Sequence, residues 1–125
     1  MRRVFKTRYF SRWMRKTELT DSALCSAVSE METGLIDANL GGGVFKKRVA
    51  LPGRGKRGST RTLVATNSVN RWFFVFGFEK KDRDNINAKE LSALKALASD
   101  LLRLGVSELS AAVAAKTLQE ICHEN

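Results

Sequence analysis

The chain has 125 residues, a length that suits one domain with a single hydrophobic core. Its 22 lysines and arginines outnumber 13 acidic residues, so the formal net charge is +9. Residues 1–85 hold 18 basic and 8 acidic groups, a net +10, whereas residues 86–125 hold 4 and 5, a net −1. This imbalance predicts that a polyanion contacts the first part of the domain rather than its C-terminal part.

Three features indicate a soluble, cytoplasmic protein with no membrane contact. The start, MRRVFKTRYF, has no apolar run behind its basic residues and does not resemble a secretory signal. The longest apolar run, WFFVFGF at 72–78, is far shorter than the ~20 residues of a membrane helix. Cys25 and Cys122 form no CxxC pair, so we expect unpaired core cysteines in a reducing compartment.

The N-terminal third predicts a strand followed by two helices. Residues 3–8 alternate apolar and basic side chains, which suits a short strand. Thr20 or Asp21 can cap the second helix, which Gly34 ends. The first helix is short and amphipathic, with a core-packing stripe formed by Tyr9, Phe10, Trp13 and Met14.

Three strands are predicted in the middle of the chain. After the glycines at 41–43, residues 44–51 read as a strand, 52–59 as a loop and 60–66 as a second strand. Residues 71–79 are the richest β segment and are apolar on both faces, which is typical of a central strand covered on both sides. Simple alternation places Phe73 and Val75 on one face, and on the other Trp72, Phe74, Phe76 and Phe78.

The C-terminal part predicts two helices. Asn87 and Glu90 fit a capping box that starts a long helix, and Gly105 ends it. Ser107 can cap a last helix over residues 108–121. The expected order is βααβββα plus this C-terminal helix, a single α+β domain over residues 1–125 with one antiparallel sheet, a core at about 3–104 and a helical extension at 106–125.

The sequence lacks the motifs of metal and cofactor chemistry. His123 is the only histidine, and no Cys/His spacing fits a zinc site. No phosphate-loop or nucleophile-elbow motif occurs, and GRGKRG at 53–58 does not match a dinucleotide fingerprint. Acidic residues are scattered, whereas metal-dependent nucleases need clustered anionic ligands. We therefore expect no metal and no cofactor, and any catalytic groups should be cationic.

The basic segment at 46–62 predicts a phosphate-binding surface. It holds seven lysines and arginines and no acidic residue. In a strand, Lys46 and Arg48 project from one face and Lys47 from the other. Clustered like charges are destabilising unless an anion lies among them, and RNA supplies one phosphate per nucleotide. The predicted contacts on this surface and around it are Lys46, Lys47, Arg48, Arg54, Lys56, Arg57, Arg61, Lys80, Lys81 and Arg83.

Three successive motifs resemble one known family. The run GGGVFKKRVALPGRGKRGSTRTLV (41–64) is followed by FVFGFEKKDRDNI (74–86) and by a helix with the pattern E-L-x-x-L-K-x-L-A. Together they resemble the RelE superfamily of bacterial type II toxins. The likeness is greatest to the HigB-like branch, which has a basic strand, a G-[KR]-G-K-[RS]-G loop and an arginine on the next strand. It covers roughly residues 3–104.

The resemblance implies an activity and a set of catalytic residues. Members of the family cut mRNA, usually in the ribosomal A site, without metal, and a cognate antitoxin neutralises them. The family's basic strand pair falls on Lys46 and Arg48, and its arginine after the glycine-rich loop falls on Arg61. Its basic residue after the last strand falls on Lys81, with Lys80 beside it. Some relatives add a tyrosine near the C-terminal end, where this chain has Asn87; its sole tyrosine is Tyr9.

The mechanism that follows from this assignment is attack by a ribose 2′-hydroxyl on the adjacent phosphate, which leaves a cyclic phosphate and a 5′-hydroxyl. Lys46 or Arg48 would remove or orient the hydroxyl proton. Arg61 would stabilise the charge on the phosphoryl oxygens, and Lys81 would protonate or shield the leaving oxygen.

Two other classes of protein fit part of the pattern. A non-catalytic RNA- or ribosome-binding protein would use the same cations, and its affinity would fall steeply with salt. A DNA-binding module is less favoured, because the sequence has no helix-turn-helix with a basic recognition helix. The apolar stripes of the helices that start at Asn87 and Ser107 either complete the core or present a groove to an antitoxin segment.

Overall fold

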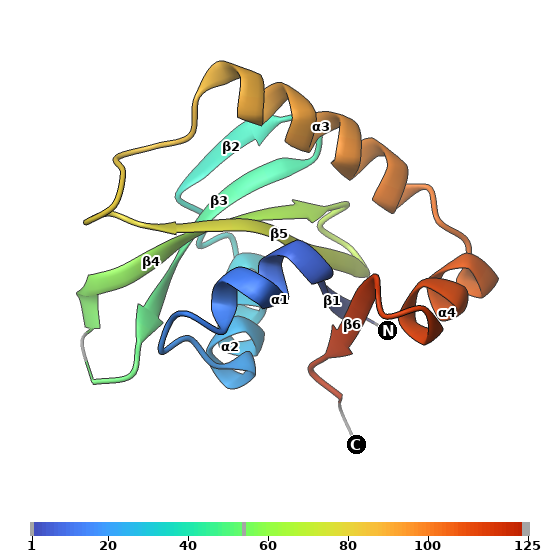
Figure 1. The fold of residues 1–125 in the computed structure, drawn as a ribbon, viewed down its shortest axis with the longest axis horizontal. Helices are drawn as coiled ribbons and strands as arrows, with labels where there is room; N and C mark the ends of the chain where they lie inside the picture. The colour runs from blue at the N-terminus through green and yellow to red at the C-terminus, as the bar shows by residue number, and fades with distance from the viewer. Residues whose placement is uncertain (1, 54, 124–125) are drawn as a thin grey trace.

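A computed structural model describes residues 2–53 and 55–123 of the chain, without the side chains of residues 55–58. The described residues form four helices and one six-stranded sheet, which confirms the α+β class (Figure 1). No helix in this part of the chain is long and apolar enough to cross a membrane. The elements are β1 (Arg3–Thr7), α1 (Arg8–Met14), α2 (Asp21–Glu32), β2 (Ala38–Gly41), β3 (Val44–Leu51), β4 (Gly55–Thr66), β5 (Arg71–Glu79), α3 (Ala88–Leu102), α4 (Val106–Ala114) and β6 (Leu118–Ile121).

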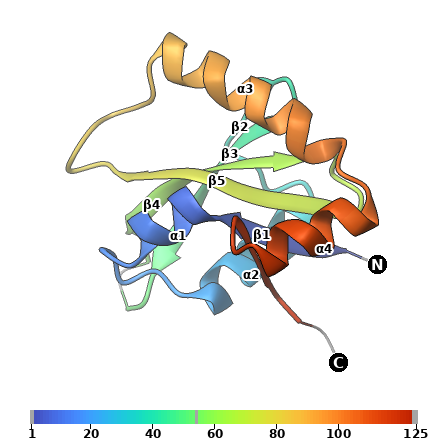
Figure 2. The same cartoon turned by 45° about the vertical axis from the view of Figure 1, so that its right-hand side comes forward.

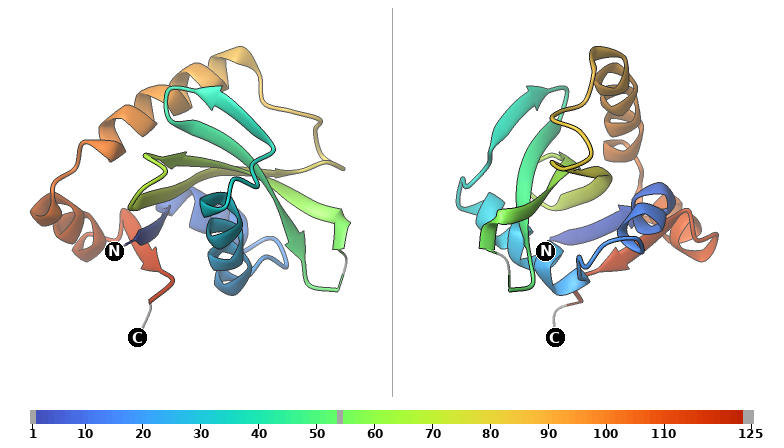
Figure 3. Two further views of the ribbon diagram at one scale, coloured as in Figure 1. Left: turned by 180° about the vertical axis from the view of Figure 1, so that it is seen from behind. Right: turned by 60° about the vertical axis from the view of Figure 1, so that its left-hand side comes forward.

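The sheet has the strand order β2-β3-β4-β5-β1-β6, in which only the β1–β5 pair of the described residues is parallel. The helix α3 lies on one face, and α1 and α2 lie on the other (Figure 2). Seen from behind, α2 again lies across the sheet from α3 (Figure 3). The aromatic strand β5 is central and is covered by a hydrophobic cluster on each face, as the sequence predicted.

A β-bulge at Val75 interrupts the alternation of β5. Leu63 of β4 pairs with Phe76 but the next residue, Val64, pairs with Phe74, so Val75 is the extra residue on β5. Trp72 and Phe74 pack on the α1/α2 side, whereas Phe76 packs with the cluster under α3. The Phe78 ring lies 6.4 Å from that of Phe76. The prediction that all four aromatic side chains share one face is therefore wrong for Phe76 and Phe78.

Gly77 lies next to the bulge and faces α1. A Cβ atom at this position would lie 2.3 Å from Cζ3 of Trp13, closer than any van der Waals contact. The glycine therefore lets the indole of α1 pack directly on the backbone of β5.

Two buried lysines of the sheet hold α2 in place. Lys6 of β1 pairs with Asp21 in the first turn of α2, with Nζ 2.7 Å from Oδ1. Lys47 of β3 pairs with Glu30 near the last turn, with Nζ 2.7 Å from Oε1. Part of the basic excess is thus structural, since these ammonium groups join the sheet to the helix that covers it.

The C-terminal segment differs from the predicted helix over 108–121. The helix α4 ends at Ala114, and the chain turns through Lys116, which has a left-handed backbone (φ 63°). Residues 118–121 then form β6, antiparallel to β1. Arg3 of β1 donates two hydrogen bonds of 2.9 Å to the carboxylate of Glu120, which fixes this edge strand. The strand β2 was also not expected.

Cys25 and Cys122 form a disulfide, so the prediction of unpaired cysteines is wrong. Cys25 lies on α2, and Cys122 follows β6 directly. The pairing of β6 with β1 brings Cys122 to α2, although the two cysteines are 97 residues apart in sequence.

Removal of this disulfide is expected to lower stability by about 2–5 kcal/mol, because the crosslink restricts a long loop of the unfolded chain. Urea unfolding of the wild type with and without reductant, and of the double variant Cys25→Ser/Cys122→Ser, measures the loss. Reductant should change nothing in the double variant. A wild type equally stable in both conditions would contradict the bridge.

The variant Glu120→Gln tests how β6 is attached through Arg3. The pKa of Glu120 lies below its ordinary value, mainly because its carboxylate accepts hydrogen bonds from Arg3. Partial burial raises the pKa, and the charge of the Arg3 guanidinium lowers it further. This stabilisation is complete above the unfolded-state pKa and is lost as the pH falls through the lower folded-state pKa. The variant should be about 1–2 kcal/mol less stable at pH 7, where the amide lacks the charge.

Urea unfolding across a pH series measures this difference between Glu120→Gln and the wild type. We expect a constant difference from about pH 7 to pH 5 that shrinks below about pH 4, where the wild-type carboxylate becomes protonated. A difference as large at pH 3 as at pH 7 would assign the effect to packing rather than to charge.

Candidate functional site

Three of the predicted catalytic side chains lie on one face of the sheet. The β3–β4 register places Arg48 directly opposite Arg61, and Lys46 directly opposite Leu63. Leu63 is buried in the cluster under α3, so Lys46, two residues from Arg48, shares the α3 face with both arginines. The hairpin register therefore places cations from two neighbouring strands on the α3 side.

Arg48 and Arg61 form a like-charge pair across the two strands. Directly opposite side chains have Cβ atoms about 4.5–5.5 Å apart, and like charges in this arrangement are destabilising. Asp37 relieves one of them: it accepts hydrogen bonds from the Arg48 backbone N–H at 2.6 Å and from its Nε at 2.9 Å. Burial opposes ionisation of Asp37, but these bonds and the charges of Arg48 and Lys47 outweigh it and lower the pKa of the carboxyl group.

Arg61 differs from Arg48 in its partners. Arg61 is half-buried, and its guanidinium donates a hydrogen bond to the backbone carbonyl of Ser59 at 3.2 Å. Among the described residues it has no carboxylate partner. A half-buried arginine held by a neutral carbonyl and facing another arginine is suited to binding an external anion.

The segment between β5 and α3 crosses this face. The Nζ atom of Lys46 lies 3.4 Å from the Oδ1 atom of Asn85. Arg83 donates two hydrogen bonds to Glu90 on α3, and its guanidinium lies 5.9 Å and 5.8 Å from the ring centres of Phe76 and Phe78. The bonds to Glu90 raise the pKa of Arg83 and lower that of Glu90. Arg83, predicted to contact RNA, already holds this loop to the sheet.

Lys80 and Lys81 lie in the exposed turn that follows β5. Lys81 comes three residues after Phe78, which pairs directly with Arg61, so this turn lies at the same end of the sheet as the arginine pair. The Lys81 side chain is 74 % exposed, and its Nζ is 3.7 Å from Glu79. It is therefore accessible to a ligand bound at that end.

The structure places Lys47 on the opposite face of the sheet from the predicted catalytic residues of the hairpin, so the prediction that it contacts RNA is wrong. It is 3 % exposed and paired with Glu30 on the opposite face, so its ammonium group cannot reach a phosphate on the α3 side. Arg54 lies outside the described residues. The backbone of Lys56 and Arg57 forms part of β4, but their side chains lie outside the described part of the structure.

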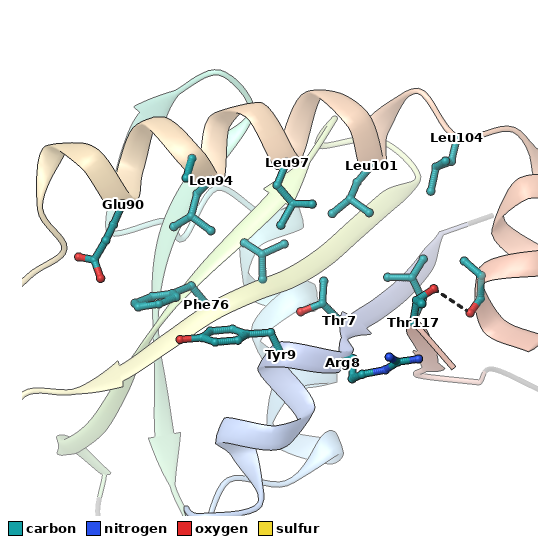
Figure 4. A pocket seen from close by; sticks show the side chains of 14 residues that line it. Thr7, Arg8, Tyr9, Phe76, Glu90, Leu94, Leu97, Leu101, Leu104 and Thr117 are labelled. Atoms are coloured by element: carbon teal, nitrogen blue, oxygen red, sulfur yellow. Dashed lines mark hydrogen bonds between the residues drawn. The ribbon is translucent and has the colours of Figure 1, made fainter. Parts of the chain in front are cut away.

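Tyr9 and Phe76 form an aromatic pair beside the cations that the sequence analysis did not assign to the site. Their ring centres are 5.9 Å apart and their planes differ by 14° (Figure 4). The pair stands at one end of a cavity of about 720 Å³ between α3 and β5, which leucines of α3 line. The prediction that Tyr9 packs in the core is therefore wrong, because its side chain is exposed. The signal in the sequence was its hydroxyl group, which favours a position at the surface.

Two polar residues of the site were also missed in the sequence. Asp37 stands alone before the basic hairpin, and Asn85 lies in a polar loop, so neither belongs to a motif. Within residues 2–53 and 55–123, the side chains of His, Cys, Asp and Glu do not gather in groups of three that would hold a metal. The arrangement offers cations next to aromatic rings, the two groups that bind phosphates and bases.

Comparison with known proteins gives one family. A family model described as the RelE toxin of the RelE/RelB toxin–antitoxin system matches residues 2–121. No curated protein matches the chain. The matched range contains every helix and strand of the described structure, from β1 to β6.

Proposed function

The chain belongs to the RelE family of toxins from toxin–antitoxin systems, and we propose that it is a metal-independent endoribonuclease that cleaves mRNA at the ribosome and so inhibits translation. The observation that carries this proposal is the convergence of Lys46, Arg48 and Arg61 on one face of the β3–β4 hairpin. Toxins of this family pair with an antitoxin.

The proposed reaction is an internal transfer of the phosphoryl group. The 2′-oxygen of a ribose forms a bond to the adjacent phosphorus, and the bond from phosphorus to the 5′-oxygen of the next nucleotide breaks. The products are a 2′,3′-cyclic phosphate and a 5′-hydroxyl. The 2′-hydroxyl loses a proton and the leaving 5′-oxygen gains one, so the reaction needs no metal and no external nucleophile.

Arg61 is the group best placed to stabilise the transition state. Negative charge increases on the non-bridging phosphoryl oxygens during attack, and a fixed cation in a partly buried position interacts with it strongly. Arg61 has this setting, because it is half-buried and held by the Ser59 carbonyl. Arg48, oriented by Asp37, would bind the same phosphate from the neighbouring strand.

The two lysines take the proton-transfer roles in this proposal. Lys46 lies two residues from Arg48 on the same face and next to Asn85. Asn85 would hold the Lys46 side chain near the 2′-hydroxyl of a bound strand. Lys81, exposed in the turn beyond Phe78, would protonate or shield the leaving 5′-oxygen.

The variant Arg61→Ala tests this assignment. We expect cleavage to fall about 10²–10³-fold, as for removal of one group that stabilises transition-state charge. The measurement is the rate of appearance of new 5′-hydroxyl ends on ribosome-bound mRNA, together with growth after induced expression. Urea unfolding should show an unchanged fold, because Arg61 donates one hydrogen bond to a carbonyl and is not among the buried core residues.

Lys47→Met is the matched control. It also removes one positive charge from the hairpin, but from the buried face that packs on α2, and methionine retains the apolar length of the side chain. This variant should cleave like the wild type. Full activity of Arg61→Ala would overturn the assignment of Arg61. A wild type that binds RNA with steep salt dependence but produces no new ends would instead support the non-catalytic RNA-binding alternative.

A further inference from the structure

We propose that Tyr9 is a base-stacking residue, whose exposed ring binds a nucleobase of the RNA strand held by Lys46, Arg48 and Arg61. This inference rests on the proposed function, since it names a second subsite on the same face of the sheet. The ligand class is a single-stranded RNA whose bases are unpaired, because only such bases present a free ring face.

Exposure separates Tyr9 from the core aromatics of α1. Its side chain is 58 % exposed, whereas the next residue, Phe10, is fully buried in the cluster on the α1/α2 side. One face of the Tyr9 ring lies nearly parallel to the ring of Phe76. Tyr9 therefore extends an aromatic stack outward from the sheet, and a planar base can continue that stack on the outer side.

The stack beneath Tyr9 is fixed from several directions. Arg83 covers the rings of Phe76 and Phe78 and is itself held by two hydrogen bonds to Glu90. Thr7 caps the first turn of α1 by accepting a hydrogen bond from the Phe10 N–H at 3.1 Å, which fixes the backbone on both sides of Tyr9. A ring held in advance loses little conformational freedom when a ligand stacks on it.

The strand register places Tyr9 in line with the cations. One row across the α3 face runs from Lys46 to Leu63 to Phe76, and Tyr9 stacks on the last of these. The next row runs from Arg48 to Arg61 to Phe78. Each row thus begins with a cation on β3 and ends with an aromatic ring on β5, about 10 Å away at the usual spacing of strands.

An RNA strand that crosses these rows can use both kinds of group. Its phosphates meet the cations of β3 and β4, and a base close to the bound phosphate reaches the ring of Tyr9. Figure 4 shows Tyr9 at the end of the cavity next to Phe76 and below Glu90, with the leucines of α3 farther along. The base subsite is therefore at the Tyr9 end of this cavity, and not among its leucines.

The test uses short single-stranded RNA with 2′-O-methyl groups, which lacks the attacking hydroxyl, and with 2-aminopurine as a fluorescent base. We expect Tyr9→Ala to weaken binding roughly 5- to 150-fold, the range for loss of one base–aromatic stack. Tyr9→Phe and Tyr9→Trp should bind like the wild type and retain quenching of 2-aminopurine. Leu35→Ala, at another exposed apolar side chain, is the matched control and should change nothing.

A salt series separates stacking from charge. Arg61→Ala should reduce the dependence of the affinity on salt, because one phosphate contact is lost, whereas Tyr9→Ala should leave the slope unchanged. If Tyr9→Ala does not fold, Tyr9→Leu replaces it, since leucine keeps apolar volume without a planar ring. The same weakening is expected for the leucine variant.

The outcomes distinguish the inference from the function. Wild-type affinity and full quenching in Tyr9→Ala, with Arg61→Ala impaired, would overturn the stacking role and leave the RNA site in place. If Tyr9→Ala binds RNA like the wild type but binds the antitoxin more weakly, Tyr9 contacts protein instead of RNA. That result would also overturn the stacking role. A wild type that binds no RNA would overturn both this inference and the proposed function.

Discussion

The candidate site depends on the β-bulge at Val75. Before the bulge, β5 presents Trp72 and Phe74 to the helices α1 and α2; after it, Phe76 and Phe78 face α3. With uninterrupted alternation, both later rings would lie under α1, and Arg61 would stand beside a residue without a side chain instead of Phe78. One additional residue therefore brings aromatic rings and cations onto the same face, and leaves Gly77 to receive Trp13 on the other.

The basic excess has two physical roles that the sequence cannot separate. Lys6 and Lys47 hold α2, and Arg3 and Arg83 hold β6 and the loop before α3, each through a carboxylate. Arg61 has no such partner among the described residues. The hairpin and the turn after β5 thus keep positive charge that a ligand can use, and an anion bound there would relieve the repulsion between Arg48 and Arg61.

Local rules predicted the elements that local interactions determine. The capping box of Asn87 and Glu90 starts α3, Thr20 caps α2, and the apolar strand β5 is central.

The same local rules failed for the elements that tertiary pairing determines. Leu118 and Ile121 are three residues apart, a spacing that suits a helical stripe, but β6 buries them in the clusters on opposite faces. β2 (ANLG) is only four residues long and ends in a glycine, and its pairing with β3 forms it. The disulfide forms because β6 brings Cys122 next to α2, so it could not be predicted without that strand. The bulge had one local signal, a glycine inside an aromatic strand.

The C-terminal segment and the aromatic end of the site are mechanically linked. Arg8, the first residue of α1, donates hydrogen bonds to the carbonyls of Ala115 and Lys116 in the turn before β6. Thr7, which caps α1, pairs with Leu118 of β6. The Cys25–Cys122 disulfide then joins the end of this segment to α2. Because Tyr9 follows Arg8 directly, the position of its ring on Phe76 depends on how β6 and the turn before it are held. Residues 115–122 therefore contribute to the site without lying in it.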